Sequence, residues 1–100
     1  RQERAEVINR RSMVLNPLAA KMEQLEKAIA QLEEEMGRNN EELITASTTG
    51  DAEAIAALAK RNAEISAEVE QLYNELATVT DQYEQAAAAF AAELENLNAV

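Results

Sequence analysis

Apolar residues recur along this chain at alternating steps of three and four, first over residues 18–46 and again over residues 55–83. The first series is Leu18, Met22, Leu25, Ile29, Leu32, Met36, Asn39, Leu43 and Ala46. The second is Ile55, Leu58, Asn62, Ile65, Val69, Leu72, Leu76, Val79 and Tyr83. Such spacing puts side chains on one narrow stripe of a helix, which is the seam of a coiled coil. The pattern therefore predicts two long helices.

The two series are mirror images of each other. The numbers of Ala46 and Ile55 sum to 101, and the same holds for every pair out to Leu18 and Tyr83. Two helices that fold back on each other near position 50 place these pairs in common layers. We therefore predict an all-α fold, an antiparallel two-helix coiled-coil hairpin.

The reversal lies at residues 48–51. Gly50 can adopt the left-handed backbone angles that end a helix, and Asp51 suits the N-cap of the next one. Such a short connection makes the neighbouring helices antiparallel. The predicted hairpin helices span residues 17–47 and 52–98. Gly37 weakens the first of them, either as a tolerated weak turn or as a hinge.

A third, short helix is predicted over residues 1–15. Proline lacks the N–H that a helix interior needs, so Asn16 and Pro17 predict a break, with Asn16 as the N-cap of the next helix. The short helix is expected to pack at the base of the hairpin and cover an alanine-rich run around Phe90. The alternative is that this run stays solvated. The apolar residues expected to form the contact are Val7, Ile8, Val14, Leu15, Phe90, Leu94 and Leu97, with Arg11 near Phe90.

Polar residues interrupt the seam only at Asn39 and Asn62, whose numbers also sum to 101. A polar layer costs stability but penalises wrong registers, so we predict that the two asparagines specify the register. At the positions flanking the seam, residues whose numbers sum to 103 are expected to meet. This rule pairs Glu42 with Arg61, Lys21 with Gln82, and Glu35 with Glu68.

The charge is unevenly distributed along the 100 residues. Residues 1–27 carry a net charge of +2 and residues 28–100 a net charge of −12, which together make −10. Cations are needed to contact phosphates, so the residues predicted to contact nucleic acid lie in the first stretch. They are Arg1, Arg4, Arg10 and Arg11.

Several function classes find no support in the sequence. The chain has no His, no Cys and no Gly-rich phosphate loop, so it is not expected to be an enzyme or to bind a metal or cofactor. No run of about 18 apolar residues predicts a membrane span. The absence of Cys fits a reducing compartment, so a cytoplasmic location is expected. Because it begins with Arg1, the chain is expected to be one helical domain excised from a longer protein.

The motifs Arg10-Arg11, Asn16-Pro17-Leu18 and Thr49-Gly50-Asp51, with the seam residues around them, resemble a known module. It is the C-terminal coiled-coil domain of bacterial ABC-F ATPases, and the similarity covers most of residues 8–84. The resemblance implies a helical hairpin behind two ATP-binding cassettes, with ATP and magnesium bound upstream. It also implies contact with ribosomal RNA or DNA.

Two functions follow from these observations. The first is a non-catalytic accessory domain of an ABC-F ATPase, which contacts the ribosome or nucleic acid through its basic N-terminal face or positions the cassettes. The second is a structural or protein-binding coiled coil that self-associates as a homodimer through its alanine-rich face.

Overall fold

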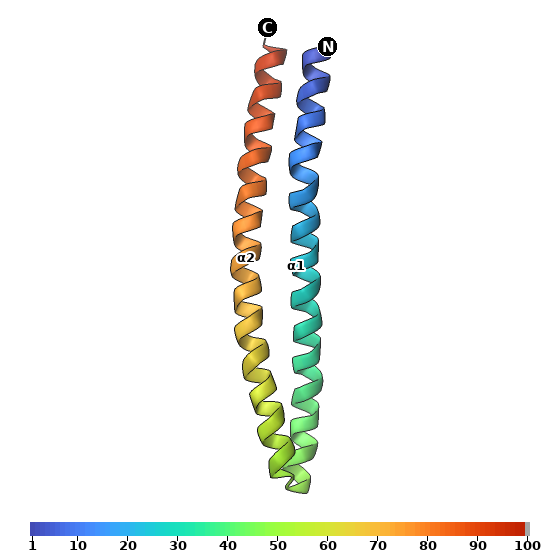
Figure 1. Cartoon of the computed structure of the whole chain (residues 1–100), viewed down its shortest axis with the longest axis vertical. Helices are drawn as coiled ribbons and strands as arrows, with labels where there is room; N and C mark the ends of the chain where they lie inside the picture. The colour runs from blue at the N-terminus through green and yellow to red at the C-terminus, as the bar shows by residue number, and fades with distance from the viewer. Residues whose placement is uncertain (100) are drawn as a thin grey trace. The chain divides into compact units, whose positions relative to one another are not determined.

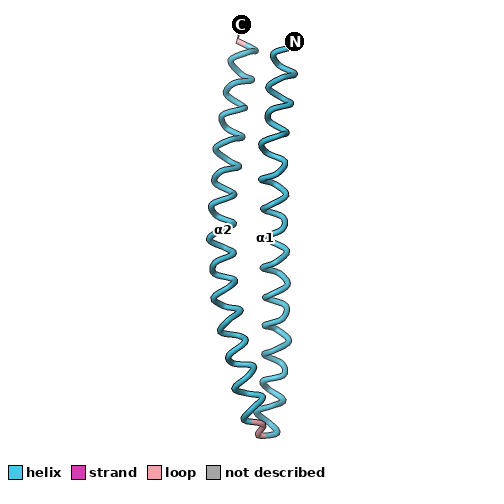
Figure 2. Tube along the Cα trace, in the orientation of Figure 1, coloured by secondary structure: helices cyan, strands magenta, loops and turns pink. Residues whose placement is uncertain are grey.

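The computed structural model describes residues 1–99, and these residues form two long helices with no strand. Helix α1 spans Gln2–Thr49 and helix α2 spans Ala52–Asn98 (Figures 1 and 2). A two-residue turn joins them, so the chain is a helical hairpin. The predicted all-α fold with two long helices is confirmed.

The seam predicted from the sequence is the buried stripe of both helices. Every residue of the two apolar series is buried or half-buried, whereas most residues between them are exposed. Ile65 is fully buried. Burying an isoleucine of this kind contributes roughly 1.5–3 kcal/mol, so a row of such layers holds the helices together.

Contacts between residues divide the chain into two compact units. The terminal unit contains Arg1–Gln24 and the chain from Glu75 onward, and the central unit contains Leu25–Asn74. The buried apolar side chains of the terminal unit are Val7, Leu15 and Val79, and those of the central unit are Leu25, Ile29, Ala46 and Ile65. The prediction of a single domain, excised from a longer protein, stays a prediction.

The turn follows from its local chemistry. Gly50 has a φ of 72°, the left-handed conformation that costs glycine least. The backbone N–H of Asp51 donates to the carbonyl of Ala46 at 2.9 Å, which closes the end of α1. The carboxylate of Asp51 accepts the N–H of Ala54 at 3.0 Å and caps α2. The predicted roles of Gly50 and Asp51 are both confirmed.

The predicted break at Asn16 and Pro17 is wrong, and so is the separate helix over residues 1–15. Helix α1 continues through Pro17. Pro17 lies on the exposed side of α1, where the carbonyl that loses its N–H donor can be solvated instead. Buried Leu15 and half-buried Leu18 flank it on the seam. Packing of these layers therefore outweighs the single missing hydrogen bond.

The first turns of α1 bury a different stripe from the one expected. Val7 and Leu15 are buried, but Ile8 and Val14 are 36% and 43% exposed, so their predicted packing at the hairpin base is wrong. Burial recurs at Val7, Arg11, Leu15 and Leu18, a spacing of eleven residues over three steps. An eleven-residue repeat follows the natural pitch of an α-helix closely, so the stripe stays on one face.

Gly37 lies within α1, and a methyl group added at its Cα would meet nothing within 4 Å. No packing need therefore explains the glycine. Helix α1 passes through it without interruption, as expected for a tolerated weak turn.

Candidate functional site

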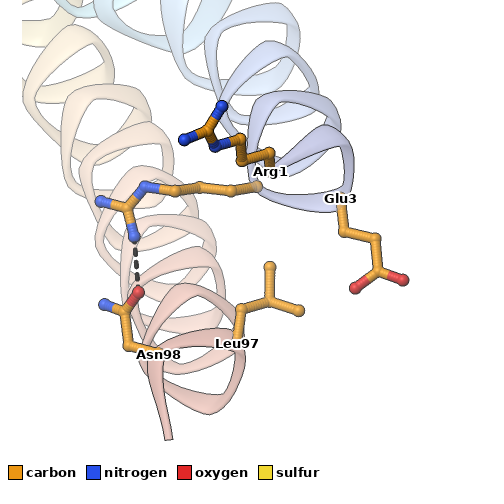
Figure 3. A pocket seen from close by; sticks show the side chains of 5 residues that line it. Arg1, Glu3, Leu97 and Asn98 are labelled. Atoms are coloured by element: carbon orange, nitrogen blue, oxygen red, sulfur yellow. Dashed lines mark hydrogen bonds between the residues drawn. The ribbon is translucent and has the colours of Figure 1, made fainter. Parts of the chain in front are cut away.

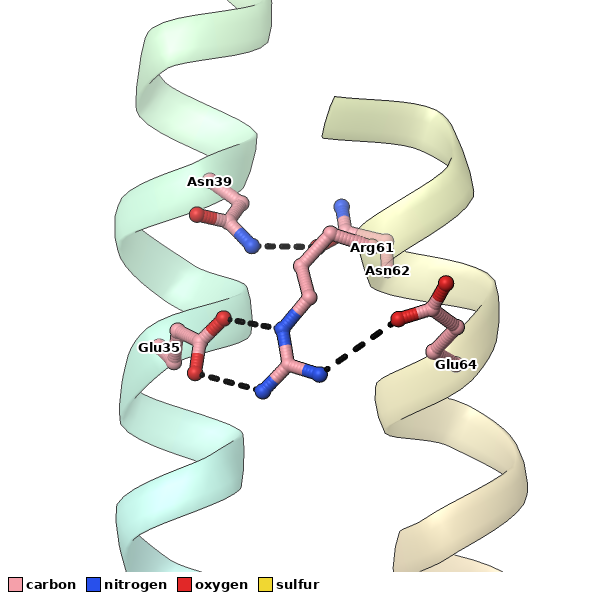
Figure 4. Close-up of polar contacts among 5 residues, drawn as sticks. All are labelled: Glu35, Asn39, Arg61, Asn62 and Glu64. Atoms are coloured by element: carbon pink, nitrogen blue, oxygen red, sulfur yellow. Dashed lines mark hydrogen bonds and ion pairs between the residues drawn. The ribbon is translucent and has the colours of Figure 1, made fainter. Parts of the chain in front are cut away.

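The central unit contains a ladder of three asparagine side chains. The Asn39 amide donates to the Asn62 carbonyl oxygen at 3.0 Å (Figure 4). The Asn62 amide donates to the Asn40 side-chain oxygen at 3.0 Å. Asn39 is 8% exposed and is the buried polar side chain of the core. The two seam asparagines meet as the mirror pattern predicts. Their role in specifying the register stays a prediction.

An ion-pair cluster lies beside this ladder. Arg61 donates from Nε and Nη2 to the two carboxylate oxygens of Glu35, at 2.6 and 2.9 Å, and its Nη1 lies 3.6 Å from Glu64 (Figure 4). Hydrogen bonding from Arg61 holds the pKa of Glu35 below its ordinary value. The same bonds raise the pKa of Arg61 further. A bidentate ion pair of this kind fixes the orientation of both side chains.

The predicted flanking pairs are wrong. Arg61 bonds to Glu35 rather than Glu42, and Lys21 lies 3.4 Å from Glu75 rather than beside Gln82. The observed numbers sum to 96 instead of 103, which is one heptad away. In an antiparallel pair each flanking side chain lies between two candidates on the partner helix. The long Arg61 side chain reaches Glu35 on α1 and Glu64 on its own helix. A rule based on residue numbers alone does not account for the length of a side chain.

Two of the four arginines predicted to contact nucleic acid bond to α2. The Arg4 guanidinium donates to the side-chain oxygen of Asn98 at 2.7 Å, beside a shallow hollow lined by Arg1, Glu3 and Leu97 (Figure 3). Arg10 donates to Glu93 and lies over the ring of Phe90, 5.9 Å from its centroid. It is therefore Arg10, not Arg11, that covers Phe90.

The other two arginines have no such bond. Within residues 1–99 the guanidinium groups of Arg1 and Arg11 make no ion pair or hydrogen bond. The chain's remaining arginines are all paired, since Arg38 lies 3.5 Å from Glu34. Contact of the four arginines with nucleic acid stays a prediction, and Arg1 and Arg11 are the two that bond to no side chain of the described residues.

Arg11 lines a groove of about 380 Å³ in the terminal unit. Helix α1 contributes Ser12, Leu15 and Asn16 beside Arg11, and α2 contributes Tyr83, Ala87 and Ala91. The sequence reasoning singled out Arg11 but missed the groove. The available signal was the small residues four apart on α2, which leave space next to Tyr83.

Among the described residues there is neither a candidate metal-binding group nor a candidate membrane-spanning helix. Among residues 1–99, no group of three or more Asp or Glu side chains could hold a metal ion. No described helix is long and apolar enough to cross a membrane. The grooves and ion pairs described above are therefore the candidate functional features.

Comparison of the chain with protein-family models, with curated proteins and with solved structures found no match. The likeness to ABC-F ATPases stays a prediction from the motifs of this sequence.

Proposed function

We propose that this chain is a non-catalytic accessory domain of an ABC-F ATPase, an antiparallel coiled-coil hairpin that contacts ribosomal RNA or another nucleic acid, or positions the cassettes. The mirrored seam, the capped turn at Gly50 and the asparagine pair support a hairpin of this kind. ATP and magnesium would bind in the cassettes, outside this chain. A cytoplasmic setting belongs to the same proposal.

One observation favours contact with nucleic acid. Arg4, Arg10, Arg38 and Arg61 bond to other side chains of the hairpin, whereas Arg1 and Arg11 make no hydrogen bond or ion pair with residues 1–99. The terminal unit carries five basic and eight acidic side chains, a net charge of −3. A surface with a net negative charge repels most phosphates. The contact therefore depends on Arg1 and Arg11 rather than on a broad basic patch.

A salt titration tests this function. Fluorescence anisotropy with a dye-labelled RNA stem–loop is measured from 25 to 200 mM KCl for the wild type and for Arg1→Ala with Arg11→Ala. Each lost phosphate contact reduces the slope of log K against log salt by about 1, so the double variant should lose about 2. Lys27→Ala with Lys60→Ala changes the charge equally and should leave the slope unchanged. No binding at 25 mM, or an unchanged slope in the arginine variant, contradicts the proposed nucleic-acid contact.

A second candidate is self-association, and the exposure of the alanine run favours it. Ala88, Ala89, Ala91 and Ala92 are exposed on α2, and small side chains let a second helix approach closely. A second hairpin packed there would form a four-helix bundle.

A further inference from the structure

Arg11 occupies an unusual place for a charged residue. It is half-buried on the seam stripe of α1 between Val7 and Leu15, both of which are buried. Its guanidinium nitrogens stay in contact with solvent, because no buried side-chain nitrogen within residues 1–99 lacks a partner, and no carboxylate of the described chain pairs with it. Arg4, an exposed arginine about two turns closer to the N-terminus, bonds to Asn98. Arg11 is therefore held beside the groove with its donors unused.

The groove that Arg11 lines has two chemically different walls. Beside the apolar Leu15, the α1 wall offers hydrogen-bond donors, namely the Arg11 guanidinium, the Ser12 hydroxyl and the Asn16 amide. The α2 wall is the Tyr83 side chain with the methyl groups of Ala87 and Ala91. Its volume of about 380 Å³ lies within the range of roughly 300–1,000 Å³ that small-ligand sites occupy.

We propose that this groove binds one unpaired nucleotide of a single-stranded nucleic acid. The phosphate would bond to Arg11 with help from Ser12 and Asn16, and the base would lie against Tyr83 and the two alanines. Guanidinium groups match the geometry of phosphate oxygens, and bases stack on aromatic rings without sequence preference. The inference rests on the nucleic-acid contact proposed above and names its site and the form of its ligand.

Two other occupants fit less well. In a duplex the bases are stacked inside, so the apolar wall would stay empty, and the net charge of −3 on the terminal unit would repel further phosphates. A glutamate side chain of a protein partner would satisfy Arg11 but leave the Tyr83 wall uncovered. A nucleotide matches both walls at once.

The test compares three probes by fluorescence anisotropy at 50 mM KCl, with the full chain as it stands. The probes are a labelled ten-residue uridine oligomer, an RNA duplex of the same length, and the uridine oligomer in competition with poly-glutamate. The wild type should bind the oligomer at least tenfold more tightly than the duplex. Poly-glutamate should not displace it.

Two variants separate the groove from general charge attraction. Ala91→Leu fills the groove but keeps Arg11, and Tyr83→Leu keeps an apolar seam residue but removes the ring. Loss of base stacking predicts about fivefold or more weaker oligomer binding in each. Tyr83→Phe keeps the ring and should bind as the wild type does. Circular dichroism melting identifies any variant that loses the fold. If Tyr83→Leu unfolds the hairpin, Ala91→Leu still tests the groove, because Ala91 is exposed.

The outcomes distinguish this site from the broader function. Oligomer binding that is unchanged by both Ala91→Leu and Tyr83→Leu overturns the groove and leaves the nucleic-acid contact standing. Tighter binding of the duplex than of the oligomer also overturns the groove and leaves the nucleic-acid contact standing. Displacement by poly-glutamate assigns the groove to an acidic protein partner and overturns the nucleotide. Absence of binding to any RNA overturns both the nucleotide site and the proposed nucleic-acid contact.

Discussion

At the scale of single residues, polar groups at the helix contact are placed where they satisfy one another. No buried side-chain nitrogen or oxygen within residues 1–99 lacks a hydrogen-bond partner. Asn39 and Asn62 meet that requirement inside the seam, where an unpaired amide would cost roughly 1–3 kcal/mol. A register shift would separate them, and this penalty is the physical basis for their predicted role.

The Glu35–Arg61 pair predicts a pH dependence of stability. Because bonding in the folded state lowers the pKa of Glu35, the pair contributes its full stability above the ordinary glutamate pKa of about 4.3. The contribution is lost as pH falls through the lower folded-state pKa. Glu35→Gln should therefore be less stable than the wild type at pH 7, and the gap should close toward pH 2. Urea unfolding at five pH values measures it.

The control is Glu68→Gln, which removes the same charge from an exposed position. The wild type of this acidic chain loses charge repulsion on acidification, so only the difference between wild type and variant is informative. A gap that is constant from pH 7 to pH 2 would show that the ion pair has no role in it.

At the scale of elements, α1 shows that tertiary contacts can override a local signal. Proline in a helix interior removes a hydrogen bond and crowds the preceding turn, at a cost of about 3 kcal/mol. The seam residues on both sides of Pro17 still bury their side chains against α2. A break would expose several apolar layers, each comparable in free energy to the proline penalty.

Pro17→Ala should therefore stabilise the hairpin. The variant regains one backbone hydrogen bond and loses the ring, so the free energy of unfolding should rise by about 1–3 kcal/mol. Thermal or urea unfolding followed by circular dichroism measures the change. Ala20→Gly, which weakens the same exposed stretch of α1, should shift it the other way by about 1 kcal/mol. A less stable Pro17→Ala would mean that the proline shapes α1 in a way that the native packing requires.

At the scale of the whole molecule, the question is whether the chain acts alone or with a copy of itself. The exposed alanines of α2 favour close helix approach, whereas a net charge of −10 makes two copies repel each other. Added salt screens that repulsion, so dimers should increase between 50 and 500 mM salt. Sedimentation equilibrium measures the fraction of dimer.

Matched variants assign the surface. Ala88→Glu with Ala92→Glu places charge within the alanine run and should abolish dimers. Gln71→Glu with Gln82→Glu adds equal charge elsewhere on α2 and should not. A chain that stays monomeric at every salt concentration removes the self-association candidate.

Periodicity along the chain was enough to predict two long antiparallel helices, their seam, the turn and the meeting of Asn39 with Asn62. These features depend on local periodicity and on the backbone preferences of Gly50 and Asp51, which act over a few residues. The continuation of α1 through Pro17 could not be predicted in this way, because it depends on apolar layers that α2 contributes. Only the tertiary structure shows that Arg61 bonds to Glu35, that Arg4 and Arg10 are engaged, and that Arg11 lines a groove. Long charged side chains have several partners within reach, and their choice depends on packing between helices that no single stretch of sequence contains.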